Sequence, residues 1–189
     1  MKRLLILFAF VSAGLLAAVP ASAIEDPNPR GTITIGTHVA FLPGIGFNVL
    51  GEYVLFDNLW RGHLSVGLQS GYSFRKSTDF DFIVNLDPDS SKLIETTTKN
   101  AYNHNVPINA RASYGLNITN RFEVHAGASL GLCLQTEVME SVKKDPKALF
   151  NFGFFTGARF FFTNNFGASL ELQWSLRDPY INAGVVFKF

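Results

Sequence analysis

The sequence predicts an all-β protein in which eight antiparallel strands form a transmembrane up-and-down β-barrel, preceded by a cleaved signal peptide. Three observations support this fold class: an N-terminal export signal, eight segments in which apolar and polar residues alternate, and glycines that share the polar face of those segments. Alternation with period two is typical of a β-strand whose two faces meet different surroundings. Beyond the export signal, no stretch has the pattern of a long amphipathic helix.

The first residues predict export. A basic head of Lys2 and Arg3 precedes an apolar run, and residues 21–23 read Ala-Ser-Ala, the A-x-A pattern of a cleavage site. The apolar run is short for a membrane-spanning helix, which needs about 20 residues. We therefore expect residues 1–23 to be a signal peptide and residues 24–189 to form a single barrel domain.

Eight alternating segments follow the signal. In chain order they cover residues 32–41, 47–56, 63–75, 105–115, 121–134, 149–161, 166–176 and the last residues up to Phe189. Glycines and charged residues share one face, with Gly51 as the exception, and large apolar residues share the other. A narrow barrel has a crowded interior, and a charge that faces lipid costs about 2–4 kcal/mol at mid-depth. We therefore expect the apolar face outside and the polar face inside.

Aromatic residues at the ends of the segments predict two girdles at the membrane interfaces. Trp60 and Phe187 are expected in one girdle, and Tyr72 and Tyr180 in the other. The alternative is a soluble lipocalin-like binding barrel, which hides its apolar face inside. Large aromatics would then crowd a narrow interior while glycines faced outward, so we favour the membrane barrel.

The last strand carries a resemblance to a known family. Ala183, Val185, Phe187 and Phe189 alternate to the end of the chain. With the signal peptide and the strand count, this pattern resembles the small eight-stranded outer-membrane barrels of Gram-negative bacteria, the OmpA/OmpX-like family, over the whole mature length. The resemblance implies a place in the bacterial outer membrane, contact with outer-membrane lipid, and a terminal signal of Val185, Phe187 and Phe189 for the barrel-assembly machinery.

The same resemblance places the longest connection, residues 76–104, on the extracellular side, and the short connections in the periplasm. Phe80 and Phe82 continue the alternation of the third segment, and Asp87 and Asp89 lie in the middle of the connection. One expectation is a hairpin that continues above the membrane, with unpaired edges suited to strand addition by an extracellular protein partner. The other is a loop with local β character.

Charged residues on the polar face predict a filled interior. They are Glu52, Arg111, Glu123, Arg159, Glu171 and Lys188. Buried charges need partners, and an eight-stranded barrel is just wide enough to be filled by its own side chains. We expect an ion-pair network with a structural role; the spacing leaves the individual pairings open.

A lipid A-modifying barrel enzyme is the main alternative function. Acyl chemistry needs a serine nucleophile and a histidine base within hydrogen-bond reach. His63 and Ser65 share a strand face but fall at the periplasmic rim, and neither His38 nor His104 has a serine–acid partnership readable from spacing. We therefore expect no catalytic site, and a structural or surface-interaction role through the extracellular loops.

Composition argues against other partners and cofactors. Without Lys2 and Arg3, the 16 basic residues become 14, against 15 acidic ones, so no basic character points to nucleic acid. No His, Asp or Glu cluster has metal-ligand spacing, and the single cysteine, Cys133, is expected to be a small strand residue. We expect no cofactor.

Overall fold

The computed structural model describes residues 27–41, 44–60, 62–84, 94–139, 142–143, 145–176 and 180–189. The expected signal peptide lies outside these ranges. The strands are β1 (Ile33–Phe41), β2 (Ile45–Leu59), β3 (Gly62–Val84), β4 (Ile94–Thr119), β5 (Phe122–Met139), β6 (Val142–Lys143), β7 (Lys147–Phe161), β8 (Phe166–Ser175) and β9 (Tyr180–Lys188). In the part of the chain that the structure describes, no helix has the length and apolar character needed to cross a membrane.

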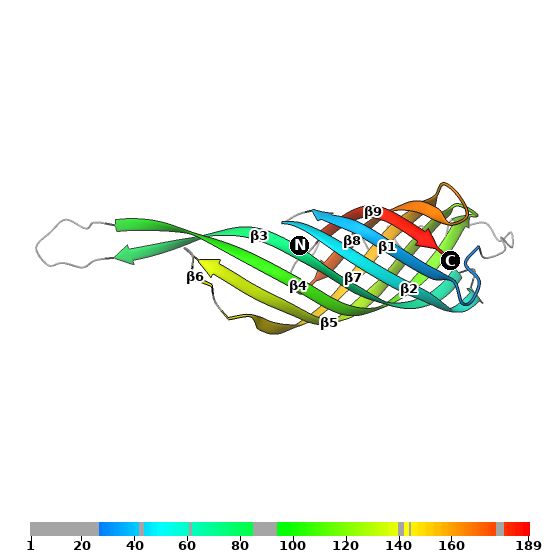
Figure 1. Cartoon of the computed structure of the whole chain (residues 1–189), viewed down its shortest axis with the longest axis horizontal. Helices are drawn as coiled ribbons and strands as arrows, with labels where there is room; N and C mark the ends of the chain where they lie inside the picture. The colour runs from blue at the N-terminus through cyan, green and yellow to red at the C-terminus, as the bar shows by residue number, and fades with distance from the viewer. Residues whose placement is uncertain are drawn as a thin grey trace, which may run out of the picture.

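Eight of these strands form a closed antiparallel ring (Figure 1). Each long strand pairs with the next long strand along the chain, and β9 returns to pair with β1. The two-residue strand β6, which the sequence did not predict, pairs with the end of β5 and adds no member to the ring. The prediction of an eight-stranded antiparallel up-and-down barrel is confirmed.

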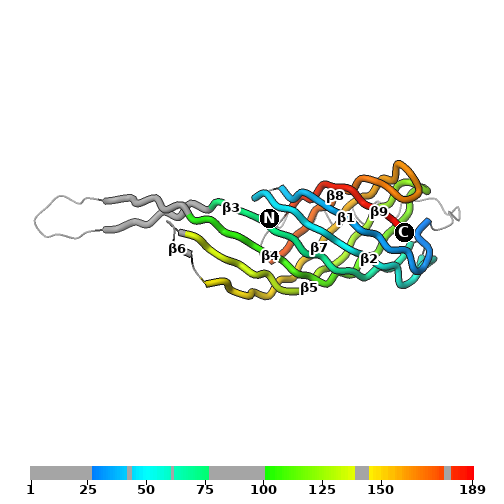
Figure 2. The backbone as a smooth tube through the Cα atoms, in the orientation of Figure 1, coloured from blue at the N-terminus to red at the C-terminus, as the bar shows by residue number. Residues whose placement is uncertain are grey.

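The ring closes where the first and last strands meet (Figure 2). Their register runs from Thr34 opposite Lys188 to Phe41 opposite Ile181. Beyond the ladder, Ile33 and Phe189 exchange two backbone hydrogen bonds of 3.0 and 2.9 Å. Closure matters because a barrel without edges satisfies its backbone polar groups internally, as a lipid environment requires.

The two ends of the barrel differ. We call the end with the β2–β3, β4–β5 and β7–β8 connections the turn end, and the opposite end, where β3 and β4 extend, the hairpin end. At the turn end the sequence repeats itself as Thr-Asn-Arg-Phe over 119–122 and Thr-Asn-Asn-Phe over 163–166. In each turn the threonine Oγ1 accepts backbone N–H bonds from the residues two and three positions later, at 3.0–3.3 Å. A threonine hydroxyl thus stabilises both tight turns.

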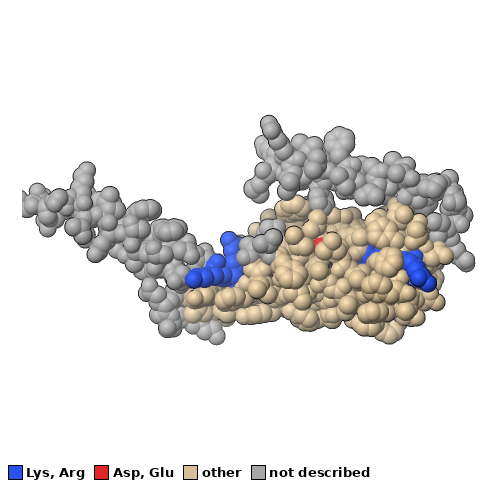
Figure 3. Space-filling model, turned by 90° about the horizontal axis from the view of Figure 1, so that it is seen from above, with Lys and Arg blue, Asp and Glu red and all other residues tan. Residues whose placement is uncertain are grey.

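The outer surface between the ends is apolar. Burial alternates along β1, with Ile33, Ile35, Val39 and Phe41 exposed. On the face drawn in Figure 3, lysine and arginine side chains gather towards the two ends, and the surface between them is mostly uncharged. This arrangement fits an apolar band in contact with lipid.

The interior side chains are mainly polar, but two expectations about aromatic residues are wrong. Tyr180 points inward, where its hydroxyl lies 2.7 Å from Ser73 Oγ, because the even-numbered residues of β9 face inside. Phe155 and Phe161 are also inside and buried, although the sequence placed large aromatics outside. Each carries a cation on its ring, Arg111 at 3.7 Å and Lys188 at 4.5 Å from the centroid, which explains their place among interior charges.

Candidate functional site

Five charged side chains from five strands meet inside the barrel. Glu52 comes from β2, Arg111 from β4, Glu123 from β5, Arg159 from β7 and Glu171 from β8, and all are buried. Their strands bring them together because each residue lies on the inward face of its strand. The structure therefore places five of the six charges expected in the network next to one another.

Arg111 is the most fully engaged of these groups. Its guanidinium donates two hydrogen bonds to Glu171, at 3.1 and 2.6 Å, and one to Gln69 Oε1 at 3.1 Å. Its Nε lies 3.2 Å from Glu52 Oε1, and its cationic carbon lies over the ring of Phe155. A bidentate arginine–carboxylate pair is among the strongest protein ion pairs, so Arg111 is the centre of the cluster.

Arg159 joins the remaining carboxylates. It donates to Glu123 Oε1 at 3.0 Å and to Glu52 Oε2. Glu52 therefore lies between two arginines, and no glutamate of the cluster lacks a cationic neighbour. Pairing of this kind offsets much of the desolvation that a buried charge suffers.

Two histidines extend the network. Sequence reasoning predicts the network but not these two members. His125 Nε2 lies 3.3 Å from Glu171 Oε2, and His63 Nε2 lies 4.0 Å from Glu123 Oε1. Sequence reasoning treats His63 only as a possible catalytic base and does not single out His125. Each lies on the inward polar face of its strand, and His125 shares its parity with Glu123 on β5; this is the sequence signal that could have identified them as members.

The sixth expected charge, Lys188, lies at the turn end with the first described residues. Its ammonium donates to the Pro27 carbonyl at 3.2 Å and lies over Phe161. Nearby, the buried Asn28 side chain donates to Glu123 Oε2 at 3.0 Å and to Asn117 Oδ1 at 3.2 Å. Pro27 and Asn28, which precede β1, thus lie at the turn end of the barrel.

Some interior polar side chains contact each other although a third strand lies between their own two strands. In four such cases the residue of the middle strand that lies between them is a glycine. Gly67 of β3 stands opposite Glu52 on one side and Arg111 on the other. Gly157 of β7 likewise stands between His125 and Glu171. Two further hydrogen-bonded pairs have the same arrangement, His38 with Ser169 across Gly184 and Asn109 with Asn151 across Gly131. We call these four sets the glycine-bridged pairs; a side chain on the middle strand would occupy the space in which the partners meet.

Gly67→Ala is therefore expected to lower the free energy of unfolding by about 1–3 kcal/mol, the usual range for overpacking. A Cβ at this position would lie 2.9 Å from Glu52 Cγ and against the Gly51 carbonyl oxygen. Gly51→Ala is the matched control, because a Cβ there meets no atom within 4 Å. The measurement is the urea midpoint of each variant refolded in detergent micelles; equal midpoints for both variants would contradict the bridging role.

One cavity near the hairpin end is small. A cavity of about 20 Å³ lies among interior residues there, including Gln69, Cys133, Gln173 and Tyr180. Such a volume holds about one water molecule.

A histidine and a serine do come within hydrogen-bond reach, but inside the barrel. His38 Nε2 lies 2.6 Å from Ser169 Oγ, and both residues are buried. Sequence reasoning missed this pair because its members are far apart in the chain. His63 and Ser65 are also buried inside, so the sheet separates both serines from a lipid outside. Among the described residues, no group of three or more His, Cys, Asp or Glu side chains could hold a metal ion.

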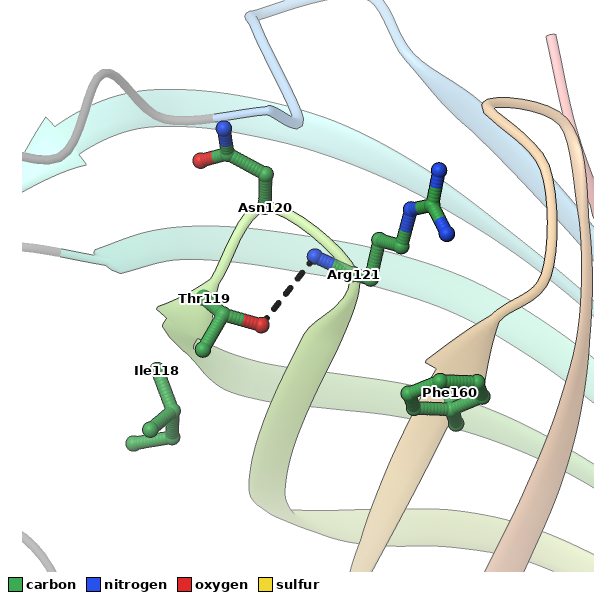
Figure 4. Close-up of a pocket in the computed structure, with 5 residues that line it drawn as sticks. All are labelled: Ile118, Thr119, Asn120, Arg121 and Phe160. Atoms are coloured by element: carbon green, nitrogen blue, oxygen red, sulfur yellow. Dashed lines mark hydrogen bonds between the residues drawn. The ribbon is translucent and has the colours of Figure 1, made fainter.

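The outer surface at the turn end has a shallow pocket beside the β4–β5 turn (Figure 4). It is lined by Ile118, Thr119, Asn120, Arg121 and Phe160. The dashed line marks the bond from the Arg121 backbone N–H to Thr119 Oγ1. The pocket is thus formed by the turn, and the hydrogen bond between its lining residues is one that stabilises the turn.

The residues of the expected terminal signal lie on the last strand. Phe187 and Phe189 are exposed on the outer face, and the Phe187 ring lies 5.1 Å from that of Phe166. Val185 shares their parity. Of the expected interaction loop, Phe80 and Phe82 belong to β3, whereas Asp87 and Asp89 lie outside the described residues.

No protein-family model matches the sequence, and no curated protein matches it at a significant level. Solved structures do match. Neisserial surface protein A (NspA) has a TM-score of 0.54 at 13% identity, covering 84% of this chain and 95% of that chain. The N-terminal β-barrel domain of Pseudomonas aeruginosa OprF has a TM-score of 0.51 at 18% identity, covering 85% and 98%.

A third match is Ail, the attachment invasion locus protein of Yersinia pestis, solved in complex with the heparin analogue sucrose octasulfate. Its TM-score is 0.50 at 13% identity, covering 85% of this chain and 99% of that chain. At these identities the likeness concerns the fold. The chain therefore has the fold of the small eight-stranded outer-membrane β-barrels.

Proposed function

We propose that this chain is an integral protein of the bacterial outer membrane, exported by a cleaved signal at residues 1–23 and folded over residues 24–189. Its barrel serves as a scaffold with a filled interior, and it interacts with other molecules at the cell surface through the β3–β4 hairpin. The apolar outer band and the closed ring support the membrane location. The charged cluster supports a structural role for the interior.

The observation that carries the surface role is the length of the hairpin. The pairing of β3 with β2 ends at Phe74, opposite Ile45, whereas its pairing with β4 continues to Val84, opposite Ile94. The β4–β5 ladder stops at Ala101, opposite Met139. Both outer edges of the described hairpin therefore extend beyond the barrel ladder. Unpaired strand edges accept an added strand from a partner, so the hairpin suits an extracellular protein ligand.

Removal of residues 78–100, with the paired residues Ser77 and Ala101 joined by an Asn-Gly turn, tests this role. We expect the shortened chain to insert as a compact barrel but to lose the surface binding that cells gain from the full chain. Adhesion of cells to immobilised extracellular proteins, compared for the two chains, measures the effect. Unchanged adhesion, with insertion intact, would contradict the role of the hairpin.

A lipid-modifying enzyme, unlike a scaffold, would change the acylation of lipid A in the outer membrane. Mass spectrometry of outer-membrane lipids from cells with and without the protein compares the acylation of lipid A directly. We expect identical profiles, because the His38–Ser169 pair faces the interior and not the lipid. A changed acylation pattern would replace the scaffold role with an enzymatic one.

We also propose that Val185, Phe187 and Phe189 form a terminal signal for the assembly machinery. Phe189 has two separable parts: its backbone bonds to Ile33, and its side chain is 71% exposed. Phe189→Ser keeps the backbone bonds and removes the ring. We expect this variant to refold in micelles like the parent but to reach the outer membrane several-fold less, measured by immunoblot of membrane fractions. Equal membrane levels would contradict a side-chain signal.

A further inference from the structure

Aromatic side chains, a histidine and a lysine gather on the outer face at the hairpin end. Tyr72, Phe74 and Lys76 come from β3, and Tyr102 and His104 come from β4. The register sets Phe74 opposite His104 and Lys76 opposite Tyr102. The Phe74 ring stacks on Tyr102 at 5.6 Å between centroids and lies 5.3 Å from the His104 ring. We call these five residues the aromatic–basic patch.

The histidine of the patch is held by one nitrogen and leaves the other available. Tyr72, which is 46% exposed, places its hydroxyl 2.6 Å from His104 Nδ1. Within the described residues, the structure records no hydrogen bond to Nε2. When the tyrosine O–H donates to Nδ1, the ring proton lies on Nε2. In that tautomer the patch offers an N–H donor for which the described residues supply no acceptor.

Among the described residues, no acidic side chain adjoins the patch on the outer face. Lys76 is exposed, and its position is diagonal to His104, a spacing of roughly 7–8 Å between neighbouring strands. The described outward residues that adjoin the patch on β2 and β5 are Ile45, Phe47, Thr136 and Val138, none of them acidic. A flexible lysine stem can bring its ammonium close to whatever His104 binds. His104 and Lys76 can therefore contact an anionic group, and the stacked rings beside them can contact an apolar part of the same ligand.

The height of the patch on the barrel agrees with the outer edge of the hydrocarbon layer. With a rise of about 3.4 Å per residue and a tilt of about 40°, Tyr72 lies roughly 26 Å above the start of β3 at Gly62. The apolar band of such barrels is about 25 Å tall. On the same arithmetic, Lys76 lies roughly 10 Å further out, at the level of lipid headgroups.

We propose that the aromatic–basic patch binds the phosphorylated headgroup of a lipid in the outer leaflet. His104 Nε2 and the Lys76 ammonium contact the phosphate, and the stacked rings of Phe74 and Tyr102 support the first part of the lipid body. Charge complementarity selects the phosphate, and the position at the edge of the apolar band selects a lipid over a soluble anion. The inference rests on the proposed membrane location.

The test is lipid retention by the full barrel. The mature chain, folded in detergent micelles, is mixed with equal amounts of dioctanoyl phosphatidate and dioctanoylglycerol, which share acyl chains and differ in the phosphate. Native mass spectrometry then counts the lipids retained. We expect preferential retention of one phosphatidate, and a loss of about tenfold in His104→Phe or Lys76→Gln, the effect of one charge-assisted hydrogen bond. Arg121→Gln, which removes a cation from the turn end, is the matched control and should retain phosphatidate normally.

Three results would overturn the inference: equal retention of the two lipids, normal retention in the double variant of His104→Phe and Lys76→Gln, or displacement of the phosphatidate by millimolar inorganic phosphate. The last result would mean a site for free phosphate. Failure of the proposed membrane location is recognised separately, because such a chain would not migrate as a compact, heat-sensitive barrel in detergent.

Discussion

Arg111→Met is expected to be the most destabilising single substitution in the barrel interior, lowering the free energy of unfolding by about 3–5 kcal/mol. The arginine donates to both oxygens of Glu171 and contacts Glu52, so its removal leaves the buried Glu171 without an arginine and Glu52 with one of its two. Methionine keeps much of the side-chain volume, which separates the loss of charge from the loss of packing. The measurement is the urea midpoint in micelles, monitored by the conversion of compact to unfolded protein on a gel.

Two comparisons make this result specific. Arg121→Met removes the same group from an exposed position at the turn end, and we expect a change within about 0.5 kcal/mol. The double variant Arg111→Met with Glu171→Gln removes both sides of the bidentate pair, and we expect it to be less destabilised than the sum of its two single variants. A loss for Arg111→Met no larger than that for Arg121→Met would contradict the role of the cluster.

Leu170→Arg is expected to lower stability in lipid by about 2–4 kcal/mol and to reduce insertion strongly. Leu170 lies near the middle of β8, between Phe166 at the turn end and Trp174 at the hairpin end, and its side chain is 53% exposed on the outer face. An arginine there would face the centre of the apolar band, where its charge has neither water nor a protein partner. Folding yield into phosphatidylcholine vesicles measures the effect.

Leu176→Arg is the matched control for this prediction. The two leucines share the same parity, and Leu176, which is 64% exposed, lies roughly 15 Å further along the barrel axis at the usual rise and tilt. Near the interface an arginine costs only about 0–1 kcal/mol, so we expect near-normal folding. If both variants folded equally well, the middle of β8 would not face lipid.

The inward position of the charged residues could be predicted from the sequence because strand periodicity is two, so parity alone separates the faces. Glu52, Arg111 and Glu171 needed no more than this rule. The same rule also shows why Tyr180 was assigned wrongly: its aromatic character outweighed its shared parity with Asn182 and Lys188. Parity is the better guide at the end of a strand.

The partners within the interior could not be predicted, because they depend on the register between strands. A shift of two residues keeps every side chain on its face but gives Arg111 a different neighbour. The glycine-bridged pairs suggest a rule for predicting which interior side chains meet in related sequences. An inward glycine on one strand, such as Gly157, indicates that polar residues on the two adjacent strands meet above it.

The central claim is that this chain is a closed barrel held in the outer membrane by its apolar outer face. The most direct measurement is membrane fractionation of cells that express the whole chain, followed by gel electrophoresis in dodecyl sulfate with and without boiling. We predict that the protein is found in the outer-membrane fraction and runs as a compact band that shifts only on heating. Recovery as a soluble protein in buffer, with one mobility before and after boiling, would contradict the account.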